Sequence, residues 1–358
     1  MAHTARIAVI GGDGIGPEVT SVGEAVLRAV AEAHRLPLRV EALDLGAERF
    51  LRDGTTLPDA TFERLRDRTD AILLGALGDP RVPDMRHARD ILLGLRRRLD
   101  LCCNIRPVVC LSDRLMPLVG HGAGDCRMVI FRENVEGEYV DAGTVDHAGT
   151  PDEVAVDHAV HTRRNVERVV RAAFDHARAH ELGHVLLTDK HNAIPRGPGL
   201  WHRVFREVSA DYPDIASDHL FVDALCLRLV QAPEAMRVIV TTNLLGDVVS
   251  DLAAGLAGGL GLAPSANVHP GRRPGLFEPV HGSAPDLAGR DVANPLATVR
   301  TVGLMLAHLG WPALQARLEG ICREAVETGH CTADVGGHLG TRATGQWVVE
   351  RVLQGSSS

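Results

Sequence analysis

Short runs of apolar residues alternate with longer segments of helical periodicity in the first part of the chain. The strand-like runs are Ile7–Ile10, Leu38–Leu43 and Ala71–Leu74, and helical segments lie at about Pro17–His34 and Ala60–Arg68. Strands that alternate with helices are typical of α/β folds in which most strands run parallel. The sequence therefore predicts the α/β class.

The alternation continues to the end of the chain, with one interruption. Further strands are predicted at Met128–Phe131, Val185–Leu187, Phe221–Val222 and Val238–Thr241, and further helices at about His161–His180, Ala293–Leu309, Pro312–Thr328 and Thr341–Leu353. Between residues 138 and 160 the pattern breaks, because few residues there suit a core. The sequence leaves two interpretations open for this stretch, an extended arm for a partner subunit or an irregular loop.

Length and charge limit the classes of function. The 358 residues exceed the usual size of one domain, so two domains are expected. A formal net charge of -8 argues against nucleic acid or an anionic membrane as the main partner. No apolar run reaches about 18 residues and no signal-peptide pattern stands at the start, so a cytoplasmic protein is expected.

Residues 275–298 are rich in glycine and proline, and polar side chains stand among them. Three glycines and three prolines argue against a helix or a central strand. His281, Ser283, Asp286 and Asn294 offer polar groups where the backbone can approach a ligand closely. Apolar residues at helical spacing follow, so the run is predicted to be a ligand-binding loop that ends on a helix N-terminus suited to phosphate.

A second glycine-rich segment, Gly11-Gly-Asp-Gly-Ile-Gly-Pro-Glu18, follows the first predicted strand. Its glycines at 12, 14 and 16 alternate, which does not match the G-x-G-x-x-G fingerprint of dinucleotide-binding folds. Pro17 suits the first position of a helix. The segment is predicted to form a tight strand-to-helix turn beside a ligand.

Two arginines flank a leucine pair in the segment Arg89-Asp-Ile-Leu-Leu-Gly-Leu-Arg96. On a regular helix Arg89, Leu92, Leu93 and Arg96 share one face. Guanidinium groups beside apolar side chains suit a carboxylated substrate with a hydrocarbon part. The alternative is a helix face that is merely solvated.

Acidic residues indicate a metal site. Asp247 and Asp251 lie four residues apart in an otherwise apolar segment, where like charges repel unless a cation intervenes. Hard divalent ions such as Mg²⁺ or Mn²⁺ take carboxylate ligands, and Asp223 follows another predicted strand. The alternative is an exposed acidic helix edge.

Lys190 and Tyr139 are candidates for proton transfer. Lys190 follows a predicted strand, where open α/β sheets place their ligands, and burial eases loss of its proton. Tyr139 lies beyond a turn after Arg132 and could act as a general acid, although a single tyrosine commonly has a structural hydrogen bond instead.

Six ordered motifs resemble the β-decarboxylating dehydrogenases of (R)-malate-type hydroxy acids, namely isopropylmalate, isocitrate, homoisocitrate and tartrate dehydrogenases. The motifs are Gly12-Asp-Gly-Ile-Gly-Pro-Glu18, Leu95-Arg96 with Asn104-Ile-Arg-Pro107, Glu133-Asn-Val-Glu-Gly-Glu-Tyr139, Asp189-Lys-His-Asn192, Asn243-Leu-Leu-Gly-Asp247 with Asp251, and His281-Gly-Ser-Ala-Pro-Asp286 with Ala293-Asn-Pro295. The resemblance covers nearly the whole chain. It implies a two-domain α/β fold with a large mixed sheet flanked by helices and a cofactor site unlike a Rossmann motif.

The resemblance also implies domain boundaries and a homodimer. Residues 1–101 and 258–358 would form the cofactor domain, and residues 102–257 the dimerisation and substrate domain. The 138–160 stretch would be an interlocking arm. Active sites shared between subunits would make the dimer obligatory.

The matched positions acquire roles from the resemblance. The substrate carboxylates would be held by Arg96, Arg106 and Arg132; Mg²⁺ or Mn²⁺ by Asp247 and Asp251 with Asp223 of a second subunit; the base would be Lys190 of that second subunit; and Tyr139 would protonate the enol left by decarboxylation. The cofactor would lie on Ile15, Asn192, Glu278, His281, Gly282, Ser283, Ala284, Asp286 and Asn294. An acidic residue at 286 would bond the ribose hydroxyls and repel a 2′-phosphate, which implies NAD⁺ over NADP⁺.

Signals for the substrate conflict. Leu92 and Leu93 match an isopropylmalate-type pocket, whereas residues 133–139 look more like the isocitrate and tartrate branches. Arg89 stands where isopropylmalate enzymes tend to have an acidic residue, and a cation there would favour a carboxylate or phosphonate substituent. Alternatively Arg89 pairs with Asp90 or points to solvent.

The expected activity is therefore NAD⁺- and metal-dependent oxidative decarboxylation of a 3-substituted (R)-malate, of the 3-isopropylmalate dehydrogenase type. The alternatives are an isocitrate, homoisocitrate, tartrate, malate or phosphonomethylmalate dehydrogenase. A non-catalytic regulatory subunit is a further alternative from another class.

Overall fold

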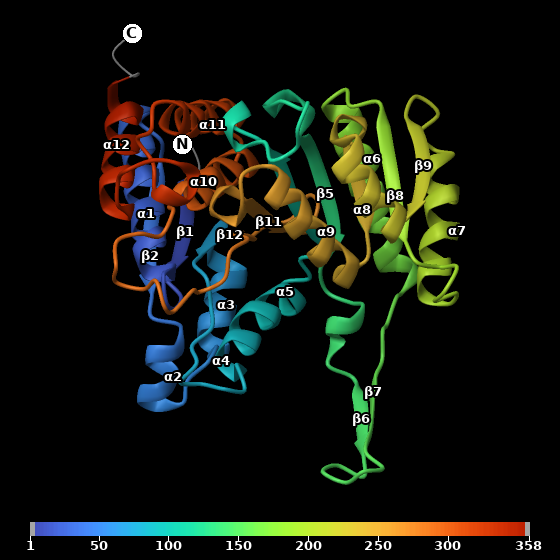
Figure 1. Ribbon diagram of the computed structural model, residues 1–358. Helices are drawn as coiled ribbons and strands as arrows, with labels where there is room; N and C mark the ends of the chain where they lie inside the picture. The colour runs from blue at the N-terminus through green and yellow to red at the C-terminus, as the bar shows by residue number, and fades with distance from the viewer. Residues whose placement is uncertain (1–3, 355–358) are drawn as a thin grey trace. The chain divides into compact units, whose positions relative to one another are not determined.

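The computed structural model describes residues 4–354, and its strands and helices confirm the α/β class (Figure 1). The chain divides into two compact units. Among the described residues, the first comprises 4–101, Val109–Cys126 and 254–354, and the second comprises Cys102–Val108 and Arg127–Ala253.

The segment Val109–Cys126 is the main departure from the predicted boundaries, which assigned it to the other domain. Arg114 donates hydrogen bonds to the carbonyl oxygens of Val326 and Val335. Arg323 in turn donates to the carbonyl oxygen of Leu111, at 3.0 Å. These bonds tie the segment to the C-terminal part of the first unit.

The first unit contains a mixed set of five strands. Its order is β2 (Leu38–Leu43), β1 (Ala5–Ile10), β3 (Ala71–Leu74), β12 (Gly275–Pro279) and β11 (Pro264–Val268). β1 runs parallel to β2 and β3, β12 runs parallel to β3, and only the pair of β11 and β12 is antiparallel. All residues of β3, β11 and β12 are buried, as is expected for strands covered on both faces.

Strand β12 contradicts the expectation that residues 275–298 contain no central strand. Gly275 is needed there because a Cβ atom at this position would lie 2.9 Å from the ring of Phe277. Pro264 and Pro279 are paired at the ends of their strands, where a missing amide hydrogen costs little. The irregular loop therefore begins only after Pro279.

Helices flank the strands of the first unit. They are α1 (Gly16–Ala33), α2 (Ala47–Asp53), α3 (Asp59–Arg68), α4 (Arg86–Ala88), a π-helical turn at Arg89–Leu93, α5 (Gly94–Arg98), α10 (Leu296–His308), α11 (Pro312–Glu327) and α12 (Thr341–Gln354). A core cluster that includes Ile10, Leu65, Ile72, Leu95 and Leu276 joins the strands to α3 and α5. None of the helices in the described part of the chain is both long and apolar enough to cross a membrane.

The second unit positions most of the candidate chemistry. Its strand order is β4 (Cys103–Val109), β5 (Arg127–Glu133), β10 (Val238–Thr241), β8 (His184–Asp189) and β9 (Ala216–Phe221), with helices α6 (Arg163–Ala179), α7 (Gly197–Ser209), α8 (Val222–Gln231) and α9 (Asn243–Leu256). β5, β10, β8 and β9 run parallel, so their carboxyl ends meet at one edge. The strand predicted at Phe221–Val222 was displaced, because β9 ends at Phe221 and α8 begins at Val222.

The 138–160 stretch forms an extended hairpin. β6 (Gly143–Asp146) and β7 (Val154–Asp157) pair antiparallel and extend away from the other strands of the second unit (Figure 1). Every residue of both strands is exposed, and Val145 is 58% exposed. A two-stranded hairpin with apolar side chains in water has little stability of its own, so this one is suited to pair with another surface.

Candidate functional site

Arg132 is held rigidly where β5 ends. Its side chain is 2% exposed, and its Nε donates to the carbonyl oxygen of Asn243 at 2.9 Å. The Asn243 side-chain oxygen accepts from Nη2 at 2.8 Å. At Gly246 a Cβ atom would lie 2.6 Å from Arg132 Cγ, so glycine allows α9 to pass directly over the arginine.

Asp247 connects three of the predicted site residues. Its Oδ1 accepts from Arg132 Nη1 at 2.5 Å and from Arg106 Nη2 at 3.2 Å, and its Oδ2 accepts from the Tyr139 hydroxyl at 2.9 Å. Both arginine side chains are at most 7% exposed, whereas that of Asp247 is 38% exposed. The Asp247 carboxylate thus faces solvent, whereas the two arginines that donate to it are buried. We call these four residues the Asp247 cluster.

Arg106 has its own fixed supports. Nε donates to Asn104 Oδ1 at 2.7 Å, and Nη1 donates to Ser250 Oγ at 2.6 Å. A guanidinium held from two sides loses little conformational freedom when it binds an anion. Asn104 and Ser250, like Asn243 beneath Arg132, had no predicted role, although Asn104 and Asn243 stand in the predicted motifs.

Asp251 lies one helical turn beyond Asp247. Its Oδ1 is 3.6 Å from Arg106 Nη1, and its side chain is 53% exposed. Burial raises the pKa of the Asp251 carboxyl, Arg106 opposes the rise, and the charge of Asp247 adds to it. Two accessible hard-oxygen donors with mutual repulsion fit a divalent ion such as Mg²⁺ or Mn²⁺.

Lys190 and Asp223 form a separate pair in the same unit. Lys190 follows β8, Asp223 lies in the first turn of α8, and Nζ is 2.5 Å from Asp223 Oδ1. The hydrogen bond from Lys190 lowers the pKa of the Asp223 carboxyl. With side chains 30% and 68% exposed, this pair is much more open than the Asp247 cluster.

Lys190 is also the only lysine in the chain. Every other strongly basic side chain is arginine, which does not lose its proton in proteins, whereas an amine can. This bias is a signal in the sequence that the motif-based prediction of a base did not use.

In the first unit, Arg96 is paired with a residue predicted to bind the cofactor. Its Nη2 donates to Glu278 Oε1 at 2.6 Å, and Asn267 Nδ2 donates to the same oxygen at 2.9 Å. Arg96 Nε is buried and has no hydrogen-bond partner among residues 4–354. This donor is therefore unsatisfied within the described part of the chain.

The regular helix predicted for residues 89–96 was wrong. Arg89–Leu93 form a π-helical turn, which changes the angular spacing of the side chains and is common at functional sites. Arg89 is exposed, Leu92 and Leu93 are half-buried, and Arg96 is buried. In the described chain Arg89 forms no ion pair with Asp90, and its side chain lies in solvent.

The glycine-rich turn packs against the loop that follows β12. Ile15 N donates to the Ser283 carbonyl oxygen at 2.8 Å. Gly14 has φ +57°, and a Cβ atom there would lie 2.1 Å from the same oxygen, so only glycine fits. The predicted turn beside the 281–294 loop is thus a close backbone contact.

Asp13, between two glycines of this turn, is a residue whose importance the sequence analysis missed. Its carboxylate accepts from Ala47 N at 2.6 Å, Gly78 N at 2.8 Å and His87 Nε2 at 2.8 Å. Asp13 and His87 are both buried. The carboxylate holds the turn to the segment that leads into the π-helical turn.

Polar side chains of the loop after β12 differ in whether they form hydrogen bonds within the chain. Asn294 Oδ1 accepts from Leu296 N at 3.0 Å and its Nδ2 donates to Asp334 at 2.9 Å, so its side chain supports the start of α10. Asp286 is exposed, and its carboxylate accepts no hydrogen bond from the residues described. Asp286 is therefore open to a ligand.

His281, in the same loop, is half-buried. Its Nδ1 lies 3.0 Å from the carbonyl oxygen of Gly282. Its Nε2 is buried without a partner in the described chain. Burial lowers the pKa of His281, which keeps the imidazole neutral near pH 7. Of the other predicted cofactor residues, Ser283 and Ala284 are half-buried, Gly282 is exposed, and Asn192 lies exposed in the second unit.

The chain is similar to known proteins over nearly its whole length. A family model described as isocitrate/isopropylmalate dehydrogenase matches residues 6–352. A 3-isopropylmalate dehydrogenase from Thermobifida fusca (strain YX) is 44% identical over 354 residues, which cover 99% of each chain. A protein of Agrobacterium vitis named "Probable tartrate dehydrogenase/decarboxylase" is 40% identical over 338 residues, or 94% of each chain. The crystal structure of isocitrate dehydrogenase from Methylococcus capsulatus matches with a TM-score of 0.88 and 35% identity, covering 98% of this chain and 100% of that one.

Proposed function

The chain belongs to the isocitrate/isopropylmalate dehydrogenase family of β-decarboxylating dehydrogenases, and from this membership we propose its reaction and its residues. It oxidatively decarboxylates a 3-substituted (R)-malate with NAD⁺ and a divalent metal ion. The observation that carries the proposal is the Asp247 cluster, in which two buried arginines and a tyrosine converge on one solvent-facing carboxylate.

Arg106 and Arg132 bind the substrate carboxylates. Both guanidinium groups are supported from behind by amide or hydroxyl oxygens, so they present donors in fixed positions. Guanidinium forks bind carboxylates with two parallel hydrogen bonds. Arg96 supplies a further guanidinium through its unpaired Nε.

Asp247, Asp251 and Asp223 hold Mg²⁺ or Mn²⁺. When bound, the ion acidifies the substrate hydroxyl and withdraws electrons from the ketone that oxidation forms. Burial raises the pKa of Asp251 and the charge of Asp247 adds to the rise. A divalent cation would relieve the repulsion between these two carboxylates of α9.

Lys190 would take the proton of the substrate hydroxyl, and bound NAD⁺ would supply the hydride acceptor for this oxidation. The next step breaks the carbon–carbon bond to the β-carboxylate and releases CO₂, and Tyr139 then delivers a proton to the enol carbon. A lysine is suited to the first step because its amine can lose a proton, and Lys190 is the only one present.

Two copies of the chain share each site. Lys190 and Asp223 pair with each other instead of with the Asp247 cluster, so a second copy supplies them. The exposed hairpin of β6 and β7 is the surface through which the copies interlock, because its valines need cover. The functional unit is a homodimer.

NAD⁺ lies on the loop after β12, with Asp286 bonded to the ribose hydroxyls of the adenosine. An exposed carboxylate that accepts no hydrogen bond from the described chain can accept two from a ribose diol, and its charge repels the 2′-phosphate of NADP⁺. The neutral, unpaired Nε2 of His281 adds a hydrogen-bonding group to the same site.

The substrate is 3-isopropylmalate. Leu92 and Leu93 are half-buried and can line an apolar pocket, whereas Arg89 lies in solvent and does not place a cation beside them. The relative from Thermobifida fusca carries the same substrate in its name. Isocitrate, homoisocitrate, tartrate, malate and a phosphonate analogue are the alternatives.

Steady-state formation of NADH with Mn²⁺ and each of these six substrates tests the proposal. The highest kcat/KM is expected for 3-isopropylmalate. A higher kcat/KM for a substrate with an anionic substituent would contradict 3-isopropylmalate as the substrate. It would instead support a role for Arg89 in binding that substituent. No NADH from any substrate would identify a non-catalytic subunit.

A further inference from the structure

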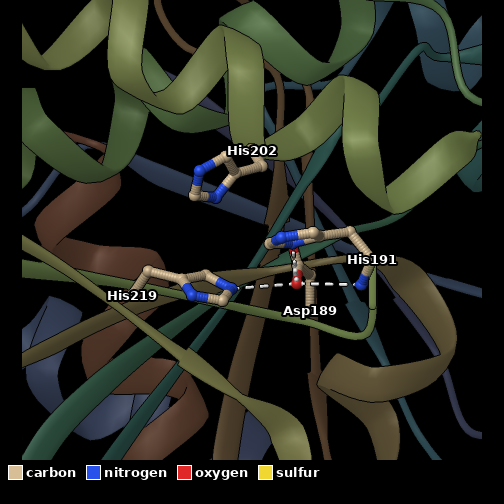
Figure 2. A group of neighbouring side chains, drawn as sticks. All are labelled: Asp189, His191, His202 and His219. Atoms are coloured by element: carbon tan, nitrogen blue, oxygen red, sulfur yellow. Dashed lines mark hydrogen bonds and ion pairs between the residues drawn. The ribbon is translucent and has the colours of Figure 1, made fainter. Parts of the chain in front are cut away.

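Three imidazoles and a buried carboxylate meet in the second unit, away from the α9 aspartates in sequence and in ligand chemistry (Figure 2). Asp189 ends β8, His191 follows it, His219 lies on β9, and His202 lies on α7. His191 Nδ1 and His219 Nε2 each lie 2.9 Å from Asp189 Oδ1. One ligand atom from each of the four residues lies within 4.8 Å of all the others.

The three imidazole rings are in mutual contact. Ring centroids are separated by 4.5 Å between His191 and His202, and by 5.0 Å between His219 and each of the other two. Positive charge on all three rings would be repulsive. Burial lowers the pKa of His202, and His191 and His219 lower it further. A neutral imidazole is the form that binds metal ions.

His202 is the member that hydrogen bonding alone does not explain. Two of the histidines share the Asp189 carboxylate, which is fully buried, and a protonated network would account for them. The Nδ1 of His202 is buried and has no partner in the described part of the chain. An ion shared by all four residues gives this nitrogen a partner, whereas a hydrogen-bond network of Asp189, His191 and His219 does not.

We propose that Asp189, His191, His202 and His219 bind one divalent transition-metal ion, with Zn²⁺ as the best match. Three nitrogens and one carboxylate oxygen form a tetrahedral zinc set, with bonds of about 2.0–2.2 Å. Donor atoms in such a set lie about 3.4 Å apart. The widest separations, up to 4.8 Å, must therefore shorten, and the two distances of 2.9 Å to Asp189 must lengthen. Imidazole ligands select against Mg²⁺, which prefers oxygen and octahedral geometry.

The ion acts as a structural clamp next to the proposed chemistry. Lys190 stands between Asp189 and His191, and Asp223 follows His219 by four residues. One ion therefore ties the ends of β8 and β9, from which the Lys190–Asp223 pair projects, to α7. His191 and His219 are 28% and 19% exposed, so the ion can enter from solvent.

Calorimetric titration of the chelator-treated full-length protein with Zn²⁺ alone tests this site. The experiment uses an Asp247→Asn/Asp251→Asn background, which removes the α9 carboxylates and separates this proposal from the proposed function. One Zn²⁺ per chain is expected, with a rise in melting temperature. His202→Gln should weaken binding at least about tenfold, since even loss of an outer-shell partner costs that much. His180→Gln, an exposed histidine of the same unit, should have no effect.

Co²⁺ gives a second readout that needs no variant beyond the Asp247→Asn/Asp251→Asn background. The intense visible absorption of tetrahedral Co²⁺ is expected in the double-aspartate background and should disappear when Zn²⁺ is added. Should His202→Gln fail to fold, His191→Ala takes its place in the titration. Absence of stoichiometric Zn²⁺ binding, or equal binding by His202→Gln and the background protein, would overturn the proposal.

Discussion

The Asp247 cluster and the Lys190–Asp223 pair, both in the second unit, differ in how completely one chain assembles them. In the first, arginine side chains that are 2% and 7% exposed converge on a carboxylate and are braced from behind. In the second, one lysine and one aspartate form an ion pair with each other, and their side chains are 30% and 68% exposed. The groups that we propose to bind the substrate carboxylates are pre-organised, whereas the pair that includes the proposed base is more open to solvent.

Physical chemistry explains this division. A buried guanidinium must have fixed acceptors, because an unpaired buried charge is strongly destabilising. A lysine that must lose a proton during turnover cannot be locked permanently to a carboxylate. The open pair is therefore suited to completion by a second copy, and the braced cluster to holding the substrate.

The largest effect is expected from Lys190→Ala. Loss of a general base lowers turnover by about 10²–10⁴-fold, while NAD⁺ affinity should stay unchanged because Lys190 is not among the residues proposed to bind the cofactor. Stopped-flow and equilibrium fluorescence titrations separate the two quantities. Unchanged turnover would show that Lys190 is not the base. The proposed difference in role between the Lys190–Asp223 pair and the Asp247 cluster would then fail too.

Matched amide substitutions sharpen the comparison through stability. Asp247→Asn removes the charge that pairs with buried Arg132, and we expect a loss of about 2–3 kcal/mol in the free energy of unfolding, below the full cost of breaking a buried pair because Asp247 is 38% exposed. Asp223→Asn leaves a half-buried lysine, 30% exposed, that water can still solvate, so little change is expected. Urea unfolding of both variants provides the test, and equal losses would count against the distinction.

Substitution of Asp286 probes the loop after β12, which we propose to bind the cofactor. Asp286→Lys replaces a repulsive charge with an attractive one, and the ratio of kcat/KM for NADP⁺ to that for NAD⁺ should rise about 10–100-fold. Asp291→Lys, which breaks a structural hydrogen bond to Arg342 N, is the control for added charge. A wild-type enzyme that already used both cofactors equally would refute the assignment.

The smallest effect concerns pH. The pKa of Asp251 is raised on folding, so its ionised form disfavours the folded state above the unfolded pKa, and this penalty is lost as pH falls through the raised pKa. Asp251→Asn should therefore leave the metal-free protein as stable as wild type or slightly more stable near pH 7. Mn²⁺ should raise the melting temperature of wild type but not of this variant. Equal stabilisation of both would exclude Asp251 as a ligand.

How much the sequence predicts depends on whether a feature is local. Leu38–Leu43, Ala71–Leu74 and Val238–Thr241 were predicted with their observed boundaries, because each is an apolar or alternating run with a clear end. β12 was missed, because its prolines and glycine are tolerated only in the context of β11 and Phe277.

Site residues follow the same rule. Asp247 and Asp251 could be found from one helical turn, whereas the Arg96–Glu278 contact joins residues 182 positions apart. The histidine group was not visible in the sequence, because β8, β9 and α7 each contribute to it and no short spacing relates the four ligands.

Subunit mixing tests the central claim, that two copies complete each other's sites. Lys190→Ala and Asp247→Asn chains, each expected to have little activity alone, would be co-refolded in equal amounts and assayed for NADH formation. In a mixed dimer one site has both lesions and the other has none. Because half of the dimers are mixed, about a quarter of wild-type activity is predicted. Activity no higher than that of either parent would show that each chain builds its site alone.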